Sequence, residues 1–102
     1  MATKRRGKET YTRWDPAENL KSEADIRAYL IASFEEAPDD ATYIAAALGD
    51  VARARGMTDL AKRTGLTRMG LYKALSKDGN PSFDTVLKVL HALGLRLAAK
   101  AA

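Results

Sequence analysis

Apolar residues recur at intervals of three and four along much of the chain, the spacing that places side chains on one face of an α-helix. The first two helical stretches lie within residues 22–37 and 39–56. The apolar positions that define them are Ile26, Tyr29, Leu30, Phe34, Ile44, Ala47, Leu48, Val51 and Ala52. Pro38 and Gly56 are expected to end these two helices, because neither residue continues a helix well.

Shorter helices are predicted in the second half of the chain, at residues 59–64, 68–76 and 83–93. The fifth helix carries its apolar residues at Phe83, Val86, Leu87, Leu90 and Leu93. Residues 95–97 then alternate apolar and polar positions, which suits a short strand. The pattern therefore predicts an all-α fold of five helices that can end in a short C-terminal strand.

Each predicted helix is preceded by a residue whose side chain can accept hydrogen bonds from the first backbone amides. These N-cap candidates are Ser22, Asp39 or Asp40, Thr58, Thr67 and Ser82. Gly49 lies inside the second helix, where we expect it to allow close packing. Gly94 suits the left-handed position that follows the end of the fifth helix.

The most specific feature is a pair of very short helices within residues 57–75. Ala61 is small enough for a second helix to cross over it, and Gly65 suits a tight turn with positive φ. Leu71 and Leu75 lie four residues apart and can anchor the second helix to the core. These spacings are typical of a helix-turn-helix, although an ordinary helical hairpin remains the alternative.

The outward face of this second helix offers side chains suited to DNA. An arginine can bind guanine through two hydrogen bonds, lysine and tyrosine can reach phosphates, and threonines at helix N-termini lie beside amides that favour a phosphate. The predicted DNA contacts are Thr58, Thr67, Arg68, Met69, Tyr72, Lys73 and Lys77. Gly70, inside the same helix, either lets the backbone approach DNA or is merely tolerated. A solvated basic face is the alternative interpretation of the whole set.

Charge is distributed unevenly along the 102 residues, whose net charge is +4. Residues 1–14 carry five basic residues and one acidic residue. Residues 15–50 carry two basic and nine acidic residues, and residues 51–102 carry ten basic and three acidic residues. A basic second half suits a polyanion, and an acidic first half suits a cationic protein. The layout therefore favours a protein with two different partners, unless both halves are simply solvated helix faces.

Other functions find little support in the composition. The chain has no cysteine and a single histidine, His91, so we expect no disulfide, no metal site, no cofactor and no nucleophile–base pair. It is therefore predicted not to be an enzyme. No apolar run approaches the roughly 20 residues that span a bilayer, and the basic N-terminus lacks the apolar core of a signal peptide. We expect a cytoplasmic protein that binds no membrane and no small-molecule substrate.

Several stretches of the chain also resemble a known family. The clearest are AAALGDVARARGM (45–57), GLYKALS (70–76), GNPSF (79–83) and VLHALGL (89–95). They are similar to the probable addiction-module antidote family, the HigA-like antitoxins, whose lambda-repressor-like (Xre-type) domain would cover about residues 41–97. The resemblance as a whole spans about residues 14–97.

The resemblance implies two partners. Members of that family neutralise a RelE/ParE-fold toxin by binding it, and they bind operator DNA to repress their own operon. For the toxin we predict apolar anchors at Trp14, Tyr29 and Phe34, beside the acidic segment. For operator DNA we predict a homodimer sealed by the fifth helix and the C-terminal segment, because helix-turn-helix proteins bind paired half-sites.

These inferences divide the chain into four parts. They are a flexible basic tail at 1–13, an N-terminal extension with an acidic helix at 14–38, the helix-turn-helix domain at 39–97 and a frayed end at 98–102. The sequence thus predicts an antitoxin of a type II toxin–antitoxin system. Two alternatives stay open: a stand-alone Xre-type repressor without a toxin, and a helical adaptor that binds only protein.

Overall fold

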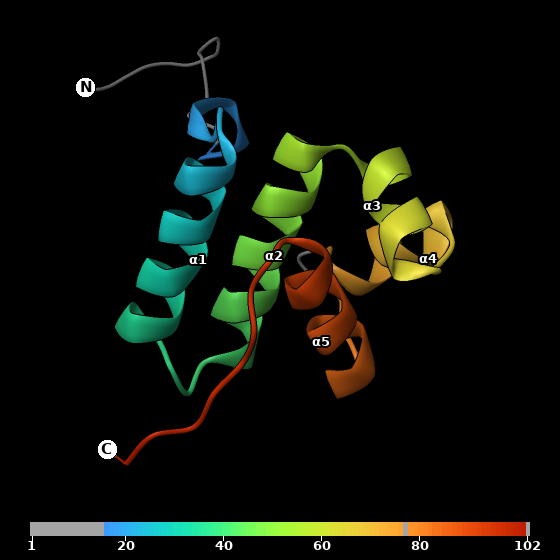
Figure 1. Cartoon of the computed structure of the whole chain (residues 1–102). Helices are drawn as coiled ribbons and strands as arrows, with labels where there is room; N and C mark the ends of the chain where they lie inside the picture. Colours follow the sequence, from blue (N-terminus) through green and yellow to red (C-terminus); the bar gives the residue numbers. More distant parts are fainter. Residues whose placement is uncertain (1–15, 77, 102) are drawn as a thin grey trace, which may run out of the picture.

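The computed structural model describes residues 16–76 and 78–101, and within them every regular element is helical. The elements are the 3-10 helix η1 (Pro16–Asn19) and the α-helices α1 (Glu23–Glu36), α2 (Ala41–Arg55), α3 (Met57–Thr64), α4 (Arg68–Ala74) and α5 (Phe83–Ala92) (Figure 1). The prediction of five helices is therefore confirmed. The predictions for the basic tail, Trp14 and Lys77 lie outside the described residues.

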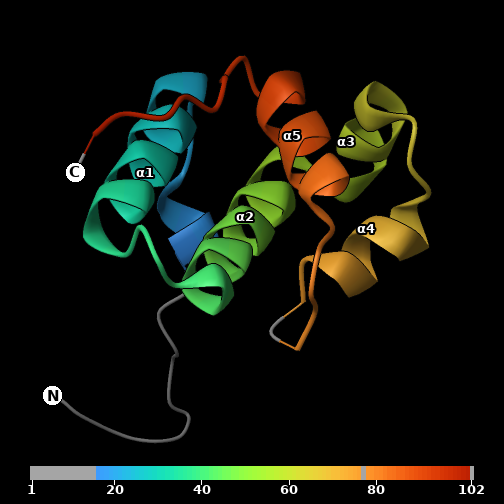
Figure 2. The same ribbon diagram turned by 90° about the horizontal axis from the view of Figure 1, so that it is seen from below.

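Helix α2 occupies the middle of the molecule, with α1 on one side and α3, α4 and α5 on the other (Figures 1 and 2). Its central position explains why α2 buries residues around most of its circumference. They are Ile44, Ala45, Ala47, Leu48, Gly49, Val51 and Ala52. Leu30 of α1, Leu60 of α3, Leu71 of α4 and Val89 of α5 are each fully buried in the same core.

Four of the five predicted N-caps are confirmed. The side chains of Ser22, Asp40, Thr67 and Ser82 each accept a hydrogen bond from the backbone amide three residues later. These bonds satisfy amides that have no partner within the helix. They fix where α1, α2, α4 and α5 begin.

The predicted cap at Thr58 is wrong. Helix α3 begins at Met57, two residues before the predicted start at residue 59, and Gly56 is both the C-cap of α2 and the N-cap of α3. Gly56 has a φ of 106°, a value that side-chain-bearing residues rarely adopt. The chain therefore turns from one helix into the next within a single residue, which leaves Thr58 inside the first turn of α3.

The C-terminal segment, residues 95–101, is extended but is not a strand, so the predicted strand at 95–97 is not formed. The amide of Leu95 still belongs to the end of α5, since it donates to the carbonyl of Leu90 at 2.8 Å. Gly94 makes this ending with a φ of 78°, as predicted. The segment then runs from α5 towards α1 (Figure 2). A strand needs a paired neighbour, and none of the described residues provides one.

Candidate functional site

The α3–α4 hairpin is held by its turn and by two buried leucines. Gly65 adopts the left-handed conformation, with a φ of 76°, and its amide donates to the carbonyl of Ala61 at 3.0 Å. Leu60 and Leu71 are fully buried beneath the two helices. This anchoring fixes α4 against the core along one side and leaves its other side in solvent.

The outer side of α4 brings together most of the predicted contact residues. Met69 is 70% exposed and Tyr72 is 62% exposed, and Arg68 and Lys73 are exposed beside them. The four residues lie within two turns of a helix whose own cationic groups have no acidic neighbour on the same element. This arrangement presents two positive charges, an aromatic hydroxyl and a thioether on one convex surface.

Thr67 and Gly70 form a single unit at the start of α4. The hydroxyl of Thr67 accepts from the amide of Gly70 at 2.9 Å. A Cβ on residue 70 would lie 2.8 Å from that hydroxyl oxygen, closer than real Cβ contacts. The glycine therefore leaves room for the cap, a reason for Gly70 that the sequence did not reveal. Thr58, by contrast, is exposed on α3 and caps nothing.

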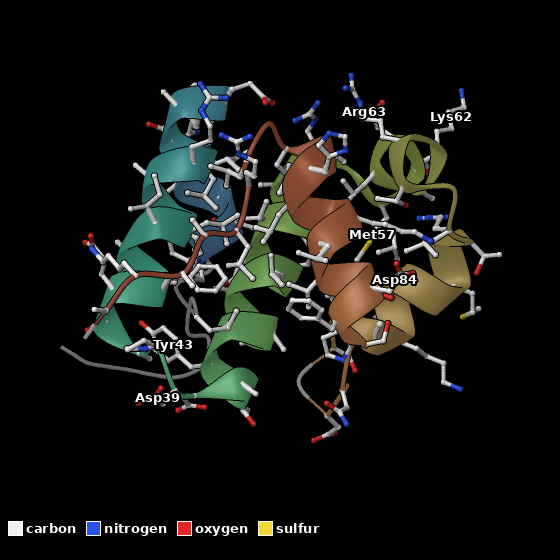
Figure 3. All side chains as sticks on the ribbon, turned by 60° about the horizontal axis from the view of Figure 1, so that its bottom comes forward. Asp39, Tyr43, Met57, Lys62, Arg63 and Asp84 are labelled. Carbon is white, nitrogen blue, oxygen red and sulfur yellow. The ribbon has the colours of Figure 1, made fainter. Side chains whose placement is uncertain are left out.

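A chain of ion pairs connects α1, α2 and α3. Arg55, at the end of α2, binds Glu23 of α1 and also Asp59 of α3, at 3.3 Å. Asp59 in turn accepts from Arg63 at 3.0 Å. The side chain of Arg55 is only 15% exposed, so this bridge is partly shielded from solvent. Figure 3 shows Lys62 and Arg63 at the end of α3, pointing away from the core.

The predicted toxin anchors do not gather in one place. Tyr29 is half-buried between α1 and α2, where its hydroxyl donates to Oδ2 of Asp50 at 2.5 Å. Burial first, and then this hydrogen bond, raise the pKa of Tyr29 well above its usual range. Phe34 lies five positions further along α1, about 140° around the helix, and faces a different surface.

Phe34 lines an apolar groove between the end of α1, α5 and the C-terminal segment. The groove has a volume of about 880 Å³. Phe83, Leu87 and Leu97 also line it and are 66%, 39% and 40% exposed. The helical spacing of Phe83 and Leu87 was predicted correctly, but these two side chains lie outside the core. The groove thus joins a predicted toxin anchor to the predicted dimer surface.

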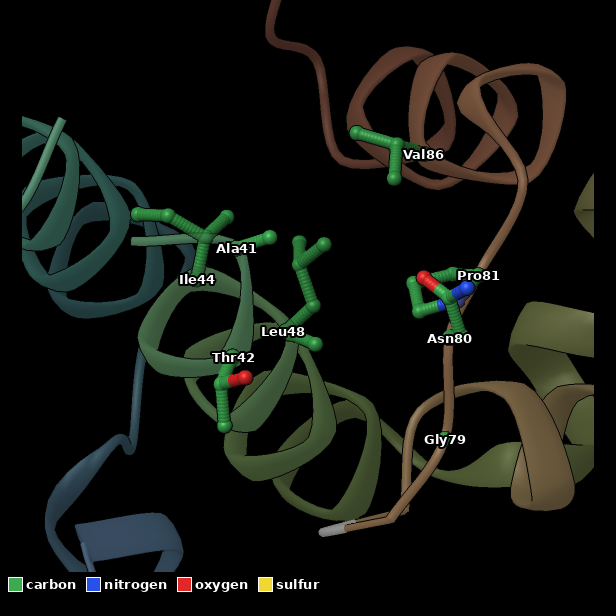
Figure 4. A pocket seen from close by; sticks show the side chains of 9 residues that line it. Ala41, Thr42, Ile44, Leu48, Gly79, Asn80, Pro81 and Val86 are labelled. Carbon is green, nitrogen blue, oxygen red and sulfur yellow. The ribbon is translucent and has the colours of Figure 1, made fainter. Parts of the chain in front are cut away.

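A smaller hollow of about 300 Å³ lies between α2, α5 and the loop that follows α4 (Figure 4). Its walls are mostly aliphatic, with Ile44, Leu48 and Val86 facing the backbone of Gly79 and the ring of Pro81. None of the residues that line it is acidic or basic. Within residues 16–76 and 78–101, no group of three or more His, Asp or Glu side chains could hold a metal ion.

No helix in the described part of the chain has both the length and the apolar character needed to cross a membrane. The predicted contact residues that the structure brings together lie on an exposed helical surface, the outer side of α4. The fold and this surface define a small all-α protein with an exposed, cationic second hairpin helix.

Comparison with known proteins supplies the family. The family model described as "Probable addiction module antidote protein" matches residues 10–101, and the chain belongs to this family. A protein of Haemophilus influenzae described only as uncharacterized is 51% identical over 83 residues, which cover 81% of this chain and 84% of that protein. No solved structure matches the chain.

Proposed function

We propose that this protein is the antitoxin of a type II toxin–antitoxin system and acts by binding, without catalysis or a cofactor. Membership of the antidote family supports the antitoxin role and implies a toxin partner. In this proposal the protein works in the bacterial cytoplasm. The finer assignments below, to DNA and to a homodimer, rest on the surfaces of the molecule. The RelE/ParE-like fold of the toxin is what the family resemblance implies.

The observation that carries the DNA assignment is the outer face of α4. Arg68, Met69, Tyr72 and Lys73 are exposed together, while Leu71 on the opposite side is fully buried. We assign α3–α4 as an Xre-type helix-turn-helix whose α4 enters the major groove of operator DNA. Arg68 reads a base edge, and Lys73 and Tyr72 bind the backbone. This binding would repress the operon that encodes the protein itself.

The apolar groove is better suited to a second copy of the chain than to the toxin. Phe83, Leu87 and Leu97 lie on α5 and the C-terminal segment, and Phe34 continues the same surface. A two-fold dimer through this groove would present two copies of α4 to paired half-sites. We therefore assign Phe34 to the dimer interface rather than to the toxin surface.

The toxin then binds the outer face of α1 and the N-terminal extension that contains Trp14. Ile31 is 51% exposed on α1, and Glu35 follows it on the same face at i+4. An exposed apolar side chain on an acidic helix suits a basic partner, since charge guides encounter and apolar contact supplies affinity. Tyr29 supports this surface from within through its bond to Asp50.

Two measurements test the proposal. Gel shifts with the region upstream of the reading frame, over a salt series, should show tighter binding than to random DNA. Co-purification with the protein encoded next to it should yield a complex. Binding to the operator without any toxin complex would instead indicate a stand-alone Xre-type repressor. Equal binding to random DNA at every salt concentration would overturn the DNA assignment.

A further inference from the structure

A groove of about 480 Å³ separates the outer edge of α2 from the second half of α4. Tyr72 and Ser76 line one side, and Asp50 and Arg53 line the other. The two helices touch at its floor, where a Cβ on Gly49 would overlap the carbonyl oxygen of Leu75. Because this contact is so close, the position of Arg53 relative to α4 is fixed by backbone packing.

The carboxylate of Asp50 pairs with the guanidinium of Arg53. The Oδ1 atom of Asp50 accepts from Arg53 at 2.7 Å, and its Oδ2 atom accepts from the hydroxyl of Tyr29 at 2.5 Å. The carboxylate is therefore tied to both α1 and α2, and its side chain is only 16% exposed. Arg53 itself is 46% exposed, so its guanidinium reaches the surface.

We propose that Arg53 is a further DNA contact, which binds a backbone phosphate in the groove between α2 and α4, opposite Tyr72. The inference rests on the proposed function, since it places α4 in a major groove. A helix in that groove has a sugar-phosphate backbone along each side, and neighbouring helices contact it. Arg53 lies outside the hairpin, so the sequence pattern gave no reason to select it.

The chemistry of the groove fits a phosphate. A guanidinium carries five N–H donors in a rigid fork, so one arginine can bind a carboxylate and a phosphate oxygen together. Tyr72 lines the facing wall, and its hydroxyl can supply a second donor. Asp50 orients the arginine but also brings a negative charge close to the phosphate. Its removal should therefore leave DNA binding intact or strengthen it.

The experiment compares Arg53→Ala with a matched control, Arg63→Ala. Arg63 is 52% exposed and pairs with Asp59 at 3.0 Å in the same way, but it does not line this groove. Fluorescence anisotropy is measured with a labelled upstream duplex and a random duplex over a salt series. Arg53→Ala should weaken binding to both duplexes by about tenfold. It should also lower the slope of log affinity against log salt concentration by about 1. Arg63→Ala should bind like the wild type.

A third variant, Asp50→Asn, separates a phosphate contact from a structural role. It breaks the same ion pair, so loss of DNA binding equal to that of Arg53→Ala would overturn the inference. Retained or tighter binding supports it. Arg53→Lys should recover part of the affinity, and circular dichroism should show each variant folded. If the wild-type protein does not bind the operator, the proposed function fails. If the wild-type protein binds the operator and Arg53→Ala binds it equally well, only the inference about Arg53 fails.

Discussion

Gly49 of α2 lies against the backbone carbonyl of Leu75, at the end of α4. Alanine is the better helix former by about 1 kcal/mol, so helix propensity alone would favour Gly49→Ala. We expect the opposite, a loss of about 1–3 kcal/mol in the free energy of unfolding, because the added methyl must push α4 away. Urea denaturation measures the change. Ala46→Gly, at an exposed position of the same helix, measures how much the exchange between alanine and glycine alone changes the free energy of unfolding.

Arg68 and Lys73 should affect operator binding in different ways. Arg68→Ala should cost about 1–3 kcal/mol at one base position and relax specificity there. Lys73→Ala should weaken binding to all sequences about equally and lower the salt slope. Competition gel shifts with single-base operator variants distinguish the two. A uniform loss for Arg68→Ala would place that residue on the backbone instead.

Tyr29 should make stability depend on pH in the alkaline range. Its pKa is raised in the folded protein, so the folded state holds the phenol proton more tightly than the unfolded state does. This stabilisation is complete below the ordinary tyrosine pKa of about 10 and is lost as the pH rises beyond it. Tyr29→Phe should cost about 1 kcal/mol at neutral pH and lose less stability above pH ~10 than the wild type does.

The apolar groove predicts the oligomeric state. Full-length protein should be a dimer by light scattering, and truncation after Gly94 should make it a monomer. Phe83→Ser should also give a monomer with unchanged helix content, because Phe83 is 66% exposed and outside the core. A full-length monomer at micromolar concentration would contradict the assignment of the groove.

Toxin binding is best tested by point variants rather than by deletion of α1. Ile26 and Leu30 of α1 are 4% and 0% exposed, so removing the helix would uncover the core. Ile31→Asp and Ala28→Lys alter exposed positions on one face of α1 that do not line the apolar groove. We expect each to reduce toxin capture in a pull-down while operator binding persists. Lys88→Glu, an exposed change on α5, is the control. Full capture by both α1 variants would move the toxin site elsewhere.

Local features of the fold were predictable, and contacts between distant segments were not. Ser22, Asp40, Thr67 and Ser82 act on amides three residues away, which sequence spacing reveals directly. Thr58 was misassigned because Gly56 serves two helices at once.

In the candidate site too, features within one helix were predictable and contacts between distant segments were not. The grouping on α4 followed from helical periodicity, as did the shared face of Phe83 and Leu87 on α5. Periodicity does not say what covers a face, so the exposure of those two side chains was not foreseen. The bonds of Tyr29 to Asp50 and of Arg55 to Glu23 join positions 21 and 32 residues apart. They depend on how α1 packs on α2, which no local pattern encodes.

The single-residue junction at Gly56 has a consequence for recognition. Because α2 passes directly into α3, the angle between the core and the hairpin depends on the backbone torsions of one residue. The ion pairs from Arg55 to Glu23 and Asp59 brace this junction on both sides. We expect the hairpin to stay fixed relative to the core, so that little conformational entropy is left to lose when it docks. If α4 binds operator DNA as proposed, selectivity would come from the fit of a rigidly held helix. A misplaced half-site could then not be accommodated by a change in the angle of that helix.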